Sequence, residues 1–283
     1  MDAAATQPDW LGTCRRITAG LRAMLDAYPS PADRAVELRR GVGGDMTLVI
    51  DDAAERVIFT ELERLHASGH DFTVISEERG EVIYGASPLR VIVDPIDGSL
   101  NAKRGLSPYA VSIAVADGPT MADVVFGFVY DFGLREEWTA RRGGGATVNE
   151  QPLLPAGERR TDRGLLEIVA VESARPEWLV RGLPDLVGVA HRVRSYGSIA
   201  FSLCQLAAGR VDGMATLWHA RSVDAAAAQL IVRESGGLVS FTTASAPLAM
   251  ELNLEVRSPV VAARTPQTLA QLAAADAVRS LTA

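Results

Sequence analysis

The feature that most constrains this chain is a short apolar run that ends at once in a pair of aspartates. Residues 89–93 are rich in β-branched side chains and predict a strand. Residues 94–99 then read DPIDGS. Pro95 restricts the backbone and Gly98 allows a close approach of other chain segments, so Asp94 and Asp97 can face one point. The pattern predicts a sheet whose edge carries a charged site.

Other acidic side chains occupy positions from which they could join that site. Glu77 and Glu78 follow a predicted strand at residues 72–75, while Asp51 and Asp224 open predicted helices. Sites in α/β proteins gather at the carboxyl ends of strands and at helix N-termini. Crowded carboxylates raise one another's pKa, and a hard cation such as Mg²⁺, which prefers oxygen ligands, relieves that repulsion. Each acid alone fits a helix cap or a solvated turn, but the joint pattern favours a cation site.

The order of elements predicts a mixed α and β fold. Antiparallel strands dominate the first part, and strands alternate with helices after a polar, proline-containing segment at residues 152–163. We therefore expect an α+β metal-binding half at 1–155 and an α/β half at 156–283 that completes the site. The predicted helices are 10–28, a segment from Asp51 to Gly69, 200–208 and 224–235. The further predicted strands are 109–116, 124–130, 136–141 and 165–171.

Composition excludes several classes of protein. Hydrophobic residues make up 48% of the 283 residues and the net charge is −7, which fits a folded, soluble domain and argues against disorder. No cluster of basic residues suggests a nucleic-acid partner, and no apolar run approaches the ~20 residues that would cross a membrane. Cys14 and Cys204 are too few for a disulfide framework, so a cytoplasmic location is expected.

Three segments in the same order resemble the inositol monophosphatase family of lithium-sensitive, metal-dependent phosphatases. They are VIVDPIDGSLN at residues 91–101, the pair Glu77 and Glu78, and VDAAAAQLIVRESGG at residues 223–237. Residues 47–51 and 101–109 are similar to the archaeal-type members, which act as inositol monophosphatases and fructose-1,6-bisphosphatases. The resemblance implies a layered αβαβα sandwich of the sugar-phosphatase type and, as in similar enzymes, a homodimer or a tetramer.

The resemblance also implies roles for individual residues. Glu77, Asp94 and the backbone carbonyl of Ile96 would hold one Mg²⁺, while Asp94, Asp97 and Asp224 would hold a second. A third ion would bind more weakly near Glu77, and Li⁺ would inhibit. The implied catalytic residues are Asp51, Glu77 and Ser99, with Asp51 and Ser99 orienting the attacking water. The expected substrate-binding residues are Asp97, Gly98, Ser99, Gly197, Ser198 and Arg221.

The implied activity is Mg²⁺-dependent hydrolysis of a small sugar or cyclitol phosphate, namely inositol-1-phosphate, fructose-1,6-bisphosphate or both. Val223 and Leu217 stand where animal members carry a tryptophan and a glutamate that contacts inositol. Strict inositol specificity is therefore not implied. The alternatives are a histidinol-phosphate phosphatase, a 3′-phosphoadenosine 5′-phosphate phosphatase, and a catalytically silent binding relative.

Overall fold

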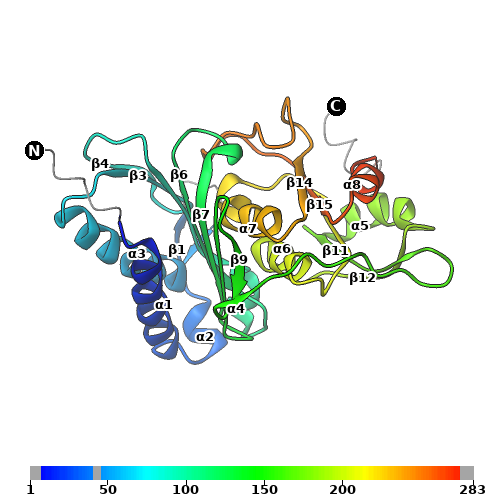
Figure 1. The fold of residues 1–283 in the computed structure, drawn as a ribbon. Coiled ribbons are helices and arrows are strands. Elements are labelled where there is room, and N and C mark those ends of the chain that lie inside the picture. Colours follow the sequence, from blue (N-terminus) through cyan, green and yellow to red (C-terminus); the bar gives the residue numbers. More distant parts are fainter. Residues whose placement is uncertain (1–7, 41–45, 275–283) are drawn as a thin grey trace, which may run out of the picture.

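The computed structural model describes residues 8–40 and 46–274. The outer ends of the two predicted halves, 1–7 and 275–283, lie outside this range, as do residues 41–45. Figure 1 shows helices and sheets stacked in alternating layers from α1 and α3 to α8. No helix in the described ranges is both long and apolar enough to cross a membrane.

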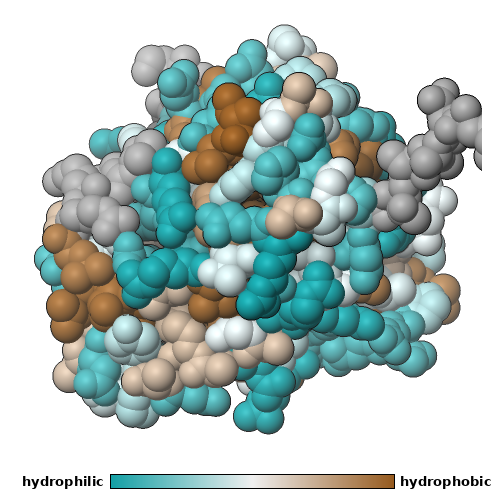
Figure 2. Space-filling view, turned by 90° about the vertical axis from the view of Figure 1, so that its left-hand side faces the viewer, coloured by the Kyte–Doolittle hydropathy of each residue, from teal (hydrophilic) through white to brown (hydrophobic). Residues whose placement is uncertain are grey.

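The first layer consists of two long helices, α1 (Trp10–Asp26) and α3 (Val49–Ala67), which pack against each other. The short helix α2 (Pro31–Arg34) and the two-stranded sheet of β1 (Glu37–Arg40) and β2 (Met46–Leu48) connect them. Apolar side chains of α1 and α3, including Ile17, Leu21 and Ile58, are fully buried against the first large sheet. Hydrophilic residues cover most of the molecular face on this side (Figure 2).

The second layer is an eight-stranded sheet in the order β10-β9-β8-β7-β6-β5-β3-β4. Only β3 and β5 pair in parallel, and the other neighbouring strands are antiparallel. This agrees with the prediction that antiparallel strands dominate the first part of the chain. The strands are β3 (Phe72–Ser76), β4 (Gly80–Tyr84), β5 (Arg90–Asp97), β6 (Ala110–Ala116), β7 (Val124–Asp131), β8 (Glu136–Arg141), β9 (Gly145–Val148) and β10 (Gln151–Pro152). Helix α4 (Ser99–Arg104) follows β5, and the 3₁₀ helix η1 (Met121–Asp123) precedes β7.

Two helices form the central layer, α6 (Ile199–Ala207) and α7 (Ser222–Glu234). Helix α7 packs on β5 to β9 of the large sheet and on β14, while α6 contacts both sheets. The residues of α7 from Ser222 to Val232 are all buried, which explains its Ala-rich sequence: small side chains let the helix lie close to sheets on both sides.

A five-stranded sheet in the order β12-β11-β13-β15-β14 forms the fourth layer. Its strands are β11 (Leu166–Glu172), β12 (Ala190–Arg194), β13 (Gly213–Thr216), β14 (Leu238–Phe241) and β15 (Val260–Ala263). Its outer face is covered by α8 (Pro266–Ala273), together with α5 (Pro176–Gly182) and the 3₁₀ helix η2 (Leu183–Leu186). The layers thus follow the expected αβαβα order. The boundary near residue 155 falls between β10 and β11, and the division into halves stays a prediction.

Strand β5 differs from its predicted end at residue 93, because it continues through Asp97. Asp94 lies opposite Ser112 and Asp97 lies opposite Ala110, so β5 carries one residue more than β6 across this interval. In a regular strand, side chains three residues apart point to opposite faces. The extra residue is a β-bulge that cancels this alternation and lets both aspartates point to one side.

Gly127 of β7 lies directly against the backbone of α7. A Cβ atom there would lie 2.5 Å from the carbonyl oxygen of Ala227, which is backbone and cannot move aside like a flexible side chain. We expect Gly127→Ala to destabilise the protein by about 1–3 kcal/mol, the usual cost of overpacking. Urea denaturation should show a lower midpoint for this variant. Gly157→Ala is the control, since its Cβ would meet nothing within 4 Å. Equal midpoints for the two variants would refute the expectation.

Candidate active site

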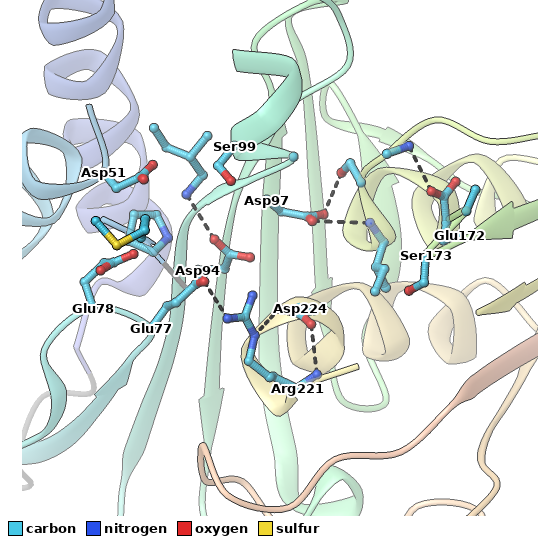
Figure 3. Close-up of a pocket in the computed structure, with 18 residues that line it drawn as sticks. Asp51, Glu77, Glu78, Asp94, Asp97, Ser99, Glu172, Ser173, Arg221 and Asp224 are labelled. Carbon is cyan, nitrogen blue, oxygen red and sulfur yellow. Dashed lines mark hydrogen bonds and ion pairs between the residues drawn. The ribbon is translucent and has the colours of Figure 1, made fainter. Parts of the chain in front are cut away.

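The acidic residues singled out in the sequence line one pocket of about 300 Å³. Figure 3 shows the ends of β3 and β5 and the N-terminal ends of α4, α6 and α7 converging on it. Asp51 and Ser99 lie on one side, Glu172 and Ser173 lie on the other, and Asp97 lies between them (Figure 3). Ile96, Gly98, Gly197, Ser198 and Arg221, also predicted from the sequence, line the same pocket.

The centre of the site is a group of three carboxylates. Glu77 follows β3, Asp94 belongs to the bulge of β5, and Asp224 lies in the first turn of α7. Each offers an oxygen atom, and these atoms lie within 4.8 Å of one another. Closely spaced carboxylate oxygens are the ligand type that a hard divalent cation binds. The side chains therefore fit the Mg²⁺ implied by the resemblance.

Burial and repulsion by neighbouring carboxylates oppose ionisation of Glu77 and Asp94. Burial, together with Asp224, Glu78 and Asp51, raises the pKa of Glu77 to about 8 although Arg221 lowers it. Burial, reinforced by the neighbouring carboxylates, raises the pKa of Asp94 well above its ordinary value. Raised pKa values of clustered, buried carboxylates are typical of functional sites, and a bound cation would favour the ionised forms.

Arg221 supplies positive charge inside the cluster. Its Nη1 atom lies 2.5 Å from Oε1 of Glu77, and its Nε atom lies 3.2 Å from Oδ1 of Asp224. The sequence predicts that this arginine contacts substrate. The structure instead pairs the guanidinium with two predicted metal ligands, so its contact with substrate stays a prediction.

Asp97 lies outside the group of three. Oδ2 of Asp97 accepts hydrogen bonds from the Ser198 hydroxyl at 2.5 Å and from the Ala200 amide at 2.7 Å. Oδ1 accepts a longer bond of 3.3 Å from the Ile199 amide. These donors belong to the N-terminus of α6, where carboxylates are stabilised. The geometry assigns Asp97 to anchoring α6 against β5, and its role as a metal ligand stays a prediction.

The sequence predicts that Asp51 and Asp224 are the first residues of their helices. In the structure each is instead the third residue, Asp51 of α3 and Asp224 of α7. Each carboxylate accepts a hydrogen bond from the residue before its helix: Asp51 from the Leu48 amide at 2.9 Å, and Asp224 from the Arg221 amide at 2.8 Å. These bonds fix both side chains at the pocket. Burial raises the pKa of Asp51 to about 7, although the Leu48 amide opposes the shift.

Gly98 allows the loops of the site to close around β5. Its φ angle of 90° favours glycine, and a Cβ would lie 3.1 Å from the carbonyl oxygen of Gly197 and 3.2 Å from that of Pro108. Ser99 then begins α4. A larger residue at position 98 would separate the walls of the pocket.

Glu172 is a pocket residue that the sequence analysis missed. It ends β11 and is 1% exposed. The signal was present, because Glu172 follows an apolar strand in the same way that Glu77 and Asp94 do. It was not recognised because no second acid adjoins it and the family motifs do not include it.

Comparisons with known proteins agree with this site and fold. The model of the inositol monophosphatase family matches residues 17–282. The fructose-1,6-bisphosphatase/inositol-1-monophosphatase of Methanothermobacter thermautotrophicus is 31% identical over 90% of this chain and 91% of its own. The Nus factor SuhB of Pasteurella multocida is 35% identical over 69% of this chain and 71% of its own.

A solved inositol monophosphatase–fructose 1,6-bisphosphatase has the same fold. It superposes with a TM-score of 0.79 over 93% of this chain and 98% of its own, at 23% sequence identity. The resemblance predicted from the sequence motifs is therefore confirmed, and the chain belongs to the inositol monophosphatase family.

Proposed function

We propose that this chain is a Mg²⁺-dependent phosphomonoesterase that hydrolyses a small sugar or cyclitol phosphate. The observation that carries the proposal is the convergence of Glu77 after β3, Asp94 in β5 and Asp224 in α7, whose oxygen atoms lie within 4.8 Å of one another. A cation held there would polarise a phosphoryl oxygen and acidify a bound water. The proposal extends the family assignment, since that family consists largely of phosphatases.

The chain's own groups suit the remaining tasks. The amides of Gly98 and Ser99 at the start of α4 lie at the pocket, where N–H groups can bind phosphate. Asp51, with its pKa near 7, can hold a proton or accept one near neutral pH. Ser99, on the same side of the pocket, can orient a water through its hydroxyl. Phosphoryl transfer needs chiefly positioning and charge stabilisation, which this set supplies.

Two considerations support the substrate class. A pocket of about 300 Å³ suits a single sugar or cyclitol phosphate rather than a polymer. A relative that covers most of this chain is named for both fructose-1,6-bisphosphate and inositol-1-phosphate. We infer that one or both are substrates. Weaker candidates are histidinol phosphate and 3′-phosphoadenosine 5′-phosphate.

A binding role is the second candidate, because several relatives are named Nus factors. A role of that kind need not use the carboxylates, yet all the predicted ligand side chains are present and line the pocket. We therefore favour an active enzyme. A cytoplasmic location, assembly as a homodimer, a third Mg²⁺ and inhibition by Li⁺ remain predictions.

Removal of one central carboxylate tests the proposed activity. We expect Asp94→Asn to lower kcat/KM about a thousandfold or more, because the metal contributes several kcal/mol of charge stabilisation. Phosphate release should be measured with Mg²⁺ over inositol-1-phosphate, fructose-1,6-bisphosphate, histidinol phosphate and 3′-phosphoadenosine 5′-phosphate. Asp162→Asn, at an exposed position, is the matched control. Wild-type inactivity on the whole panel, or full activity of Asp94→Asn, would contradict the proposal.

The raised pKa values predict a pH-dependent response to Mg²⁺. Because Glu77 has a folded pKa of about 8 and Asp97 of about 7, both above their ordinary values of 4.5 and 3.8, their protonated forms favour folding. That stabilisation is complete below the ordinary pKa values and is lost as pH rises through the folded ones. When a chelator removes divalent cations, Tm should therefore decrease as the pH rises from about 5 to about 8.

Mg²⁺ binds the deprotonated carboxylates, so the gain in Tm that it produces should grow over the same pH interval. Thermal unfolding with saturating Mg²⁺ and with chelator, at about pH 5.5 and pH 8.5, measures this gain. Asp94→Asn should show a much smaller one. An identical Mg²⁺-induced gain at both pH values would contradict the assignment of these carboxylates to the cation.

A further inference from the structure

Glu172 has an arrangement of partners that its family motifs do not explain. It is buried at the end of β11 yet lines the pocket on the side away from Glu77. Within the described residues, two backbone amides and a hydroxyl donate to its carboxylate, and no arginine or lysine forms an ion pair with it. Its Oε1 atom accepts from the Tyr196 amide at 2.9 Å and from the Ser202 hydroxyl at 2.6 Å, and Oε2 accepts from the Gly197 amide at 2.8 Å.

Two of these donors belong to the loop of residues 195–198, which joins β12 to α6. The other side of this loop is bound to the large sheet. Asn101 of α4 donates to the Tyr196 carbonyl at 2.7 Å, and the Gly197 carbonyl packs directly against Gly98. The Ser198 hydroxyl donates to Asp97. The loop is therefore held between Glu172 of one sheet and the turn at residues 97–101, which follows β5 of the other.

We propose that Glu172 is a positioning residue that fixes the loop of residues 195–198, and through it Asp97, so that this wall of the pocket is preformed for substrate. The proposal rests on the proposed phosphatase function. Gly197 has a φ angle of 78°. In this conformation its own amide points to Glu172 and its own carbonyl points to Gly98. Without the carboxylate, two loop amides and the Ser202 hydroxyl lose their acceptor and the wall loosens.

The molecule contains an internal control for a merely structural carboxylate. Glu234 at the end of α7 accepts from the amides of Gly143 and Gly145, each at 2.9 Å, in the hairpin between β8 and β9. It thus binds two glycine-loop amides, much as Glu172 binds two loop amides. Glu234 does not line the pocket. A role limited to stability would make the two positions behave alike.

The experiment compares Glu172→Gln with Glu234→Gln. The glutamine amide has one accepting oxygen, so its NH₂ group must face one of the former donors. At saturating Mg²⁺, with inositol-1-phosphate and fructose-1,6-bisphosphate as substrates, we expect Glu172→Gln to raise KM about tenfold and to change kcat less than about threefold. The reason is that the loop lines the pocket while, within the described residues, its hydrogen bonds go to Glu172, Asn101 and Asp97 rather than to Glu77, Asp94 or Asp224. Glu234→Gln should leave KM unchanged.

Ser202→Ala is a second variant that can be used if Glu172→Gln folds poorly. It removes only one of the donors to Glu172 and should raise KM about two- to threefold.

Amide hydrogen exchange separates this proposal from the proposed activity. In Glu172→Gln, the Ile199 and Ala200 amides that bind Asp97 should exchange at least about tenfold faster than in the wild type, and in Glu234→Gln they should not. If exchange is faster in Glu172→Gln but the wild-type protein releases no phosphate, the positioning role is supported and the proposed activity is refuted. Unchanged exchange, or equal KM values for Glu172→Gln and Glu234→Gln in an active enzyme, would overturn the positioning role.

Discussion

Repulsion among buried carboxylates is the constraint on which the rest of this structure depends. Glu77, Asp94 and Asp224 bring oxygen atoms within 4.8 Å of one another in a pocket where Asp94 and Asp224 are buried. Such a group is unfavourable by itself, because burial and like charge both oppose ionisation. Its persistence requires rigid surroundings and a positive partner. Arg221 supplies part of that charge, and the proposed divalent cation supplies the rest.

The layered fold provides the rigidity. The bulge of β5 turns Asp94 and Asp97 to one side, and the Arg221 amide holds Asp224 at the start of α7. Helix α7 is buried from Ser222 to Val232 between two sheets, so a shift of Asp224 would disturb the largest apolar cluster. The energy of packing thus opposes the electrostatic repulsion. Glu172 extends the same principle to the far wall, where hydrogen bonds rather than apolar contacts hold the loop.

Local rules predict the long helices, the central strands of the first large sheet and most of the acidic residues of the pocket, but not Glu172. An acid directly after an apolar strand, as at Glu77 and Asp94, points to a sheet edge whatever the tertiary fold. The direction of each side chain was not predictable in the same way. Asp97 faces the N-terminus of α6, a partner about a hundred residues away, and Arg221 faces Glu77 because two separate loops meet. Those contacts depend on the packing of layers, which local sequence patterns do not encode. The bulge likewise depends on the register between β5 and β6.

The central claim is that Glu77, Asp94 and Asp224 together bind a divalent cation. Anomalous diffraction from crystals grown with Mn²⁺ tests it most directly, because manganese replaces magnesium and is located independently of the protein's atoms. The account predicts an anomalous peak coordinated by oxygen atoms of all three side chains, with the Arg221 guanidinium displaced from at least one of them. A pocket without a peak, or a peak bound elsewhere while Arg221 stays paired with Glu77, would contradict it.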